Sequence, residues 1–279
     1  MSAEIHSATF TTSDGVRLRV MEAGPRGPDG AVAATMPVMA FVPGWSMPAA
    51  IWQPQLAALG ASHRVAALDP RGQGESEIPA HGFNIERRAA DVREFVARYE
   101  RVVLVGWSLG ALEALQYVHR YGDAALEALV LIDSSVGEDP PPPATQFIEA
   151  LQQDRRATIE AFVREMFSSP WTALELDALV DAALRMPLEA SISLFPRGIP
   201  REHWRDIARA FGKPLLYVVT EQFAAQARNL LRNRPGTRVE VFEATGHALF
   251  VDEPDRFNRL LAAFVDEVAA AARHAPDRA

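Results

Sequence analysis

Short apolar runs alternate with amphipathic segments of helical period through the first half of the chain, and they return near its end. Such runs predict buried strands, and apolar positions three and four residues apart predict helices. Strands are expected at residues 8–12, 16–22, 37–42, 64–68, 102–107, 128–132, 215–220 and 238–242, and helices at residues 49–59, 85–99, 109–121 and 254–272. This alternation predicts an α/β fold, with a mostly parallel twisted sheet and helices on both of its faces.

The alternation stops after residue 133 and resumes at residue 215. Four consecutive prolines, Pro140–Pro143, leave the core as a stiff segment. The residues that follow have helical periodicity only, with helices expected at residues 146–153, 156–167, 173–186 and 202–211. We therefore predict a core formed by residues 1–133 and 213–279. A helical cap, or lid, of residues 134–212 is inserted after the sixth strand.

One strand ends in a pattern typical of a catalytic turn. Residues 106–110 read Gly-Trp-Ser-Leu-Gly, which is G-x-S-x-G between a strand and a helix. Such a turn holds Ser108 in a strained backbone conformation that aims its hydroxyl out of the sheet. Glycine is needed on both sides because a Cβ there would clash with the neighbouring strand and helix. The pattern predicts Ser108 as a nucleophile, which would need a neighbouring base to take its proton.

Four segments in a fixed order carry a family resemblance. They are Pro43-Gly44-Trp45, the stretch Asp-Pro-Arg-Gly-Gln-Gly-Glu-Ser at residues 69–76, the turn at Ser108, and Gly246-His247 before the last helix. With these segments the chain resembles the α/β-hydrolase superfamily over nearly its whole length. It looks like the serine esterases and perhydrolases with a helical lid. The resemblance implies the α/β-hydrolase fold, an enzyme that is a carboxylic ester hydrolase, and His247 as the base.

The acid of the catalytic triad departs from the commonest pattern of the superfamily. Many relatives carry an aspartate after the strand at residues 215–220, but Phe223 stands at that place here. Two carboxylates are candidates. Asp133 ends the preceding core strand, and some members of the superfamily place their acid there. We favour Asp133 because it is short and ends its strand directly, and Glu221 remains the alternative.

The resemblance also implies an oxyanion hole made of two backbone N–H groups. One belongs to Leu109, the residue after the nucleophile, and the other to Trp45. Relatives carry a His-Gly pair before the second donor, whereas this chain has Pro43 and Gly44. The proline leaves the backbone donor in place but changes the hydrogen bonds that shape the loop.

Large apolar side chains gather near these motifs and in the predicted cap, which indicates a mostly apolar substrate pocket. The residues expected to line it are Trp45, Met47, Trp107, Met166, Trp171, Phe195 and Leu249.

Composition excludes some chemistry. The 279 residues contain no cysteine, which removes thiolate catalysis, disulfides and cysteine-ligated zinc. We expect neither a metal nor an organic cofactor. The net charge of −8 argues against nucleic acid or an anionic membrane as a partner. A small-molecule substrate is expected, and a homodimer is left open. With no signal peptide visible, we expect a cytoplasmic protein.

The sequence thus predicts a serine hydrolase that cleaves a small-to-medium, mostly apolar ester, thioester or lactone through an acyl-enzyme on Ser108. Alternatives on the same fold are a carbon–carbon bond hydrolase and a cofactor-free dioxygenase, in which the histidine would deprotonate a substrate hydroxyl. A ligand-binding pseudoenzyme is a further alternative.

Overall fold

The computed structural model describes residues 3–25, 36–170 and 173–274. Its eight-stranded sheet has the order β1-β2-β4-β3-β5-β6-β7-β8. The strands are β1 His6–Thr11, β2 Arg17–Ala23, β3 Val38–Val42, β4 Val65–Asp69, β5 Val102–Trp107, β6 Leu126–Ile132, β7 Leu215–Thr220 and β8 Thr237–Phe242. The pairs β1–β2 and β2–β4 are antiparallel and the others are parallel, so the predicted sheet is confirmed.

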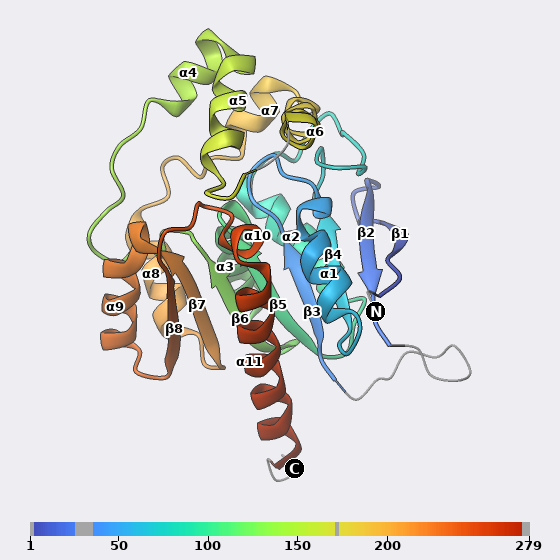
Figure 1. Cartoon of the computed structure of the whole chain (residues 1–279), viewed down its shortest axis with the longest axis vertical. Coiled ribbons are helices and arrows are strands. Elements are labelled where there is room, and N and C mark those ends of the chain that lie inside the picture. The colour runs from blue at the N-terminus through green and yellow to red at the C-terminus, as the bar shows by residue number, and fades with distance from the viewer. Residues whose placement is uncertain (1–2, 26–35, 171–172, 275–279) are drawn as a thin grey trace.

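Helices cover both faces of the sheet (Figure 1). One face carries α1 Gln53–Leu59 and α11 Pro254–His274, which pack against each other. The other carries α2 Ile85–Val96, α3 Leu109–Tyr121, α8 Arg201–Ala210 and α9 Ala224–Asn233. Strands β3, β4, β5 and β7 are buried at every residue, because helices cover them on both sides. The parallel strands end together below the cap, and this edge is where the predicted site residues lie.

Among the described residues between β6 and β7 the regular elements are helices, and they divide into two parts. Four helices stand above the carboxyl end of the sheet (Figure 1): α4 Phe147–Gln153, α5 Arg155–Glu165, α6 Ala173–Leu184 and α7 Leu188–Ser193. The fifth helix, α8, instead packs against α3 on the face of the sheet. Helix α7 was not expected from the sequence, because six residues between Pro187 and Leu194 are too short to display a helical period.

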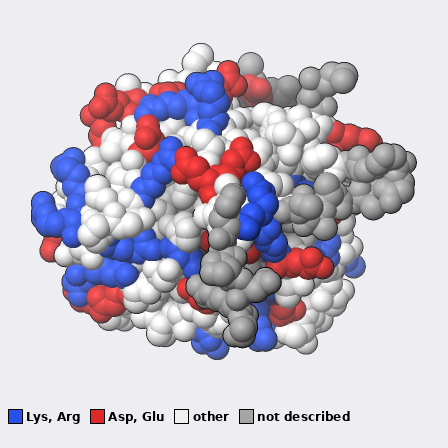
Figure 2. Space-filling view, turned by 90° about the horizontal axis from the view of Figure 1, so that it is seen from below, with Lys and Arg blue, Asp and Glu red and all other residues white. Residues whose placement is uncertain are grey.

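Charged side chains of both signs interleave on the face opposite the cap (Figure 2). Ion pairs such as Arg101–Glu127 at 3.0 Å and Arg238–Glu267 at 3.3 Å lie at the amino ends of strands β5, β6 and β8. Among the described residues, no helix is both long enough and apolar enough to cross a bilayer.

Candidate active site

Ser108 lies in the tight turn between β5 and α3. Its backbone has φ 54° and ψ −120°, a conformation that residues with a Cβ rarely adopt. The Ser108 N–H donates to the carbonyl of Ile132 at the end of β6, at 2.9 Å, which ties the turn to the neighbouring strand. Strain of this kind typically costs about 1–3 kcal/mol and gathers at functional sites. The half-buried side chain stands at the carboxyl edge of the sheet.

The glycines around Ser108 are required by close backbone contacts, as predicted. A Cβ on Gly106 would lie 2.4 Å from the carbonyl oxygen of Gly110, and a Cβ on Gly110 would lie 2.4 Å from that of Val42. Gly110→Ala is therefore expected to lower the free energy of unfolding by about 3 kcal/mol, because neither backbone can move aside easily. Chemical denaturation checks this, with Gly236→Ala as the control, since open space surrounds Gly236. Equal midpoints for the two variants would contradict the steric account.

Asp133 and His247 form the central hydrogen bond of the site. The Nδ1 of His247 donates to Oδ2 of Asp133 at 2.7 Å. The other carboxylate oxygen accepts from the N–H and the hydroxyl of Thr220, at 2.7 and 2.8 Å. Asp133 is fully buried, whereas the side chain of His247 is 26% exposed. Because Nδ1 carries the proton, Nε2 keeps its lone pair and can accept a proton from a hydroxyl.

Of the two candidate acids, the structure brings Asp133 and not Glu221 to the histidine. Glu221 lies in the short 3-10 helix Glu221–Phe223 that follows β7, and it is exposed. Phe223 in the same turn is buried. The strand after the cap therefore supplies Thr220, which holds the carboxylate of Asp133, instead of supplying the acid.

Trp107 places His247 beside the nucleophile turn. Its indole Nε1 donates to the carbonyl of His247 at 2.9 Å, and the two rings lie 5.1 Å apart. Trp107 immediately precedes Ser108, so these contacts tie the histidine loop to the strand that carries the nucleophile turn. Ser108, His247 and Asp133 follow the ends of three separate strands and lie at one edge of the sheet. Such an arrangement can activate a hydroxyl for attack on a carbonyl.

The two segments predicted to supply the oxyanion hole both lie close to Ser108. Leu109 begins α3, so its N–H is one of the first donors of the helix and has no acceptor within the helix. It lies at the positive end of the helix dipole. The loop with Trp45 passes directly over the turn. A Cβ on Gly44 would lie 3.1 Å from the Trp107 ring and 3.2 Å from the Cβ of Ser108. Glycine at position 44 thus permits the close approach that a second donor needs.

The predicted pocket residues are mostly packed into the interior. Met47 and Leu249 have no exposed surface, and Trp107 and Met166 are 1% exposed. Phe195 is half-buried, and Trp171 lies outside the described residues. A substrate could touch the four buried side chains only after neighbouring groups move, so their role in lining the pocket stays a prediction.

Trp45 joins the core to the cap. Its Nε1 donates to the carbonyl of Ser191 in α7 at 2.7 Å. Its ring packs among Phe147, Phe162 and Phe195, with ring centroids 5.2–5.6 Å apart. The side chain is only 4% exposed. Gly44 thus lies against the catalytic turn, while the side chain of the next residue, Trp45, anchors the cap helices.

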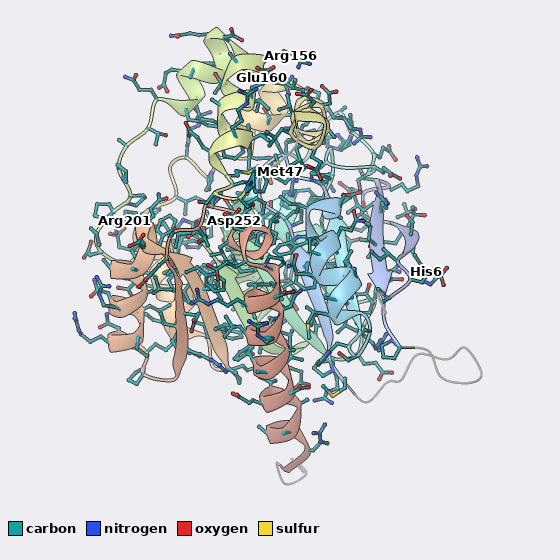
Figure 3. The ribbon with its side chains drawn as sticks, viewed as in Figure 1. His6, Met47, Arg156, Glu160, Arg201 and Asp252 are labelled. Atoms are coloured by element: carbon teal, nitrogen blue, oxygen red, sulfur yellow. The ribbon has the colours of Figure 1, made fainter. Side chains whose placement is uncertain are left out.

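Asp252 joins the histidine loop to the cap, and sequence reasoning missed it. Its carboxylate accepts from the N–H of Gly246 at 2.7 Å, from the N–H of Ser168 at 2.9 Å and from the hydroxyl of Ser169 at 2.6 Å. Figure 3 shows Asp252 where the cap meets the core. Asp252 ends the short helix α10 Leu249–Asp252, five residues after His247. Nothing in the sequence around it indicates hydrogen bonds to Ser168 and Ser169.

Asp252 is expected to stabilise the fold in a pH-dependent way. Burial alone would raise its pKa, but hydrogen bonds from Ser169, Ser168 and Gly246 hold that pKa below the usual value. A lowered folded pKa gives stability above the unfolded pKa of about 3.9, and this stability is lost as the pH falls through the folded pKa. Asp252→Asn should therefore cost about 2 kcal/mol at neutral pH and progressively less in acid.

Thermal unfolding from pH 7 down to pH 3 checks the effect of Asp252→Asn. The matched control is Asp181→Asn, because Asp181 is exposed and pairs only at the surface with Arg156 at 3.3 Å. This control should change the free energy of unfolding by less than about 0.5 kcal/mol. A constant difference between wild type and Asp252→Asn over the whole pH range would contradict the role given to the carboxylate.

The described part of the chain holds no group of three or more histidine, aspartate or glutamate side chains arranged to bind a metal. The candidate site is the set of Ser108, His247, Asp133 and the two backbone N–H groups.

Comparison with protein families supports the fold. Residues 39–260 match the Alpha/beta hydrolase family. The chain belongs to the alpha/beta hydrolase family. This confirms the predicted superfamily, fold class and enzyme class. An alpha/beta hydrolase carries its site at the carboxyl ends of the strands, where the Asp133–His247 pair lies.

Individual relatives of this alpha/beta hydrolase cover nearly the same length. The pimeloyl-[acyl-carrier protein] methyl ester esterase of Vibrio atlanticus is 26% identical over 262 residues, which are 85% of this chain and 97% of that protein. An esterase from Exiguobacterium antarcticum superposes with a TM-score of 0.78 at 22% identity, covering 93% of this chain and 99% of that one. A bromoperoxidase from Bacillus anthracis gives 0.80 at 20% identity, covering 94% and 100%. The two structures share the fold.

Proposed function

We propose that this alpha/beta hydrolase is a serine hydrolase that cleaves carboxylic esters, with Ser108 as nucleophile, His247 as base and Asp133 as the acid. The observation that carries the proposal is the 2.7 Å hydrogen bond from His247 Nδ1 to Asp133, at the edge of the sheet that also carries Ser108 with its φ of 54°. The bond fixes the tautomer that leaves Nε2 able to accept a proton. A serine hydroxyl becomes an effective nucleophile only with such a neighbour.

The reaction would proceed in two halves. The Oγ of Ser108 attacks the ester carbonyl while His247 Nε2 takes the hydroxyl proton, and the negative charge moves to the carbonyl oxygen. The N–H groups of Trp45 and Leu109 stabilise this oxyanion, each by roughly 3–4 kcal/mol. The C–O bond then breaks, and the alcohol leaves with the proton from His247. Water attacks the acyl-enzyme by the same route, releasing the acid and restoring Ser108.

The substrate we propose is a small-to-medium, mostly apolar ester, thioester or lactone. Relatives named as methyl ester esterases support ester chemistry. The half-buried rings of Phe147, Phe162 and Phe195 lie in the cap around Trp45, next to the site, and favour an apolar acyl group.

Hydrolysis of p-nitrophenyl esters from acetate to decanoate tests the proposed function. We expect turnover with a maximum of kcat/KM at one chain length, which measures the acyl pocket. A value of kcat/KM that still rises at decanoate would contradict a small-to-medium acyl group. Absence of turnover with every ester and with a lactone series would overturn the proposal and favour carbon–carbon bond cleavage or oxygenation.

A further inference from the structure

The direction of the Trp45 N–H is fixed by the carbonyl of the residue before it. The N–H of Trp45 and the C=O of Gly44 belong to one planar trans peptide, so they point in opposite directions. Any group that holds the Gly44 carbonyl in place therefore also aims the Trp45 N–H. The loop is a tight turn in which the N–H of Met47 donates to the Gly44 carbonyl at 3.2 Å, and Ser46 has φ 59°.

Gln73 holds both carbonyls of this turn with its side-chain amide. Its Nε2 donates to the carbonyl of Gly44 at 3.1 Å and to that of Met47 at 2.7 Å. Gln73 and Met47 are both fully buried, so water does not compete for these bonds. Figure 3 shows Met47 at the junction between the cap and the core.

A buried ion pair holds Gln73 in turn. Its Oε1 accepts from Nη1 of Arg88 at 2.9 Å, and Nη2 of Arg88 lies 2.9 Å from the carboxylate of Glu113. Arg88 comes from α2, and Glu113 lies on α3 one turn after Leu109, the other proposed oxyanion donor. The chain of contacts from Gly44 through Gln73 and Arg88 to Glu113 therefore joins the two segments that carry the donors.

Stability alone does not account for these buried charges. Burial raises the pKa of Glu113 to about 7, although Arg88 beside it favours the ionised form. Removing two charges from water costs free energy that their attraction often fails to restore. An apolar trio could fill the same space without that cost, but it would lack the hydrogen bond by which Arg88 positions the amide of Gln73.

The turn around Gln73 is built to direct this side chain inward. Gly72 and Gly74 both have positive φ, at 77° and 51°, and a Cβ on Gly74 would lie 1.9 Å from the carboxylate of Asp69. The N–H of Gln73 donates to the carbonyl of Pro70 at 2.9 Å. The segment at residues 69–76 thus has a definite part in the site: it presents one amide to the loop above Ser108.

We propose that Gln73 is a positioning residue that orients the Trp45 N–H toward the developing oxyanion. This inference rests on the proposed serine-hydrolase function. It also explains how the loop keeps its shape with Pro43 in place of the histidine that relatives carry. Gln73 touches no substrate and acts only through the Gly44–Trp45 peptide.

Gln73→Met tests the proposal, because methionine fills a similar volume but donates no hydrogen bond. Loss of a whole oxyanion donor costs about 10²–10³-fold in kcat. A Trp45 N–H that is present but wrongly oriented should lower kcat by less, about 10–100-fold, and should change KM by less than about 2-fold. The inhibition constant of an alkyl trifluoromethyl ketone, which forms the same oxyanion on Ser108, should rise by the factor by which kcat/KM falls.

Two further variants separate positioning from general damage. Gln116→Met removes another buried glutamine amide and should leave kcat unchanged. Gln116 lies on α3, and its Oε1 accepts from Nε2 of His203 on α8 at 2.8 Å. Gln73→Glu keeps the acceptor for Arg88 while removing the amide donor, so it serves if Gln73→Met fails to fold. A folded Gln73 variant with wild-type kcat, or with a raised KM alone, would overturn the proposal.

A crystal structure of the Gln73 variant gives a readout that does not depend on turnover. We expect the Gly44–Trp45 peptide to rotate or to occupy two orientations. An unchanged peptide would overturn the role of Gln73 whatever the enzyme's substrate. Absence of ester turnover in the wild type would instead count against the proposed function alone, so the two failures are distinguishable.

Discussion

Replacement of Ser108 by alanine is expected to lower kcat for ester hydrolysis by at least about 10⁴-fold, to the background left by binding and the oxyanion hole. The physical reason is that alanine has no hydroxyl to attack the ester carbonyl from the turn after β5, so no acyl-enzyme can form there. Steady-state kinetics with the preferred p-nitrophenyl ester measure the effect. Turnover within about 10-fold of wild type in a clean sample would show that the nucleophile is elsewhere.

A stability comparison controls for damage to the turn. Ser108→Ala should unfold close to wild type, since the hydroxyl is not part of the core. Ser108→Gly should be about 1 kcal/mol more stable than Ser108→Ala, because glycine relieves the strain of the positive φ. Both variants should be inactive. Equal stability of the two would contradict the strained backbone.

Asp133→Asn is expected to lower kcat by about 10³–10⁴-fold, with Glu221→Gln within about 2-fold of wild type. An amide at position 133 would present its NH₂ to Nδ1 of His247, which favours the tautomer whose Nε2 carries the proton. That tautomer cannot accept the proton of Ser108. Asparagine suits the comparison because it tolerates the positive φ of 41° at this residue and its carbonyl can still accept from Thr220.

The pair of variants decides between the two carboxylates. Kinetics at saturating substrate, with circular dichroism to confirm folding, give the comparison. A large loss in Glu221→Gln together with near-normal turnover in Asp133→Asn would contradict the geometry at His247 and assign the acid to the exposed side chain.

The elements that could be predicted are those whose signals are local. Buried strands such as β5 and β7 show as unbroken apolar runs, and the turn at Ser108 shows because close backbone approach admits only glycine at positions 106 and 110. Asp133 was the favoured acid because it ends β6, and the structure places it on His247. Thr220, which donates two hydrogen bonds to the Asp133 carboxylate, ends the adjacent strand β7. The order of the strands could therefore have indicated this contact.

The features that could not be predicted depend on contacts between distant segments. Apolar character marked Met47 and Leu249 as pocket residues, but it cannot tell a side chain that faces a cavity from one packed in the core, and both are fully buried. The partners of Gln73 and Asp252 lie on other loops, reached only when the chain folds. The cap shows the same limit, since α8 belongs with α3 although the sequence groups it with the other cap helices.

Covalent trapping tests the central claim most directly. The wild-type protein would be treated with a fluorophosphonate, and the adduct located by mass spectrometry of the intact chain and its peptides. The account predicts one adduct per chain, on the peptide with Ser108, absent in Ser108→Ala and formed much more slowly in Asp133→Asn. Continued ester turnover without an adduct on Ser108 would contradict the account.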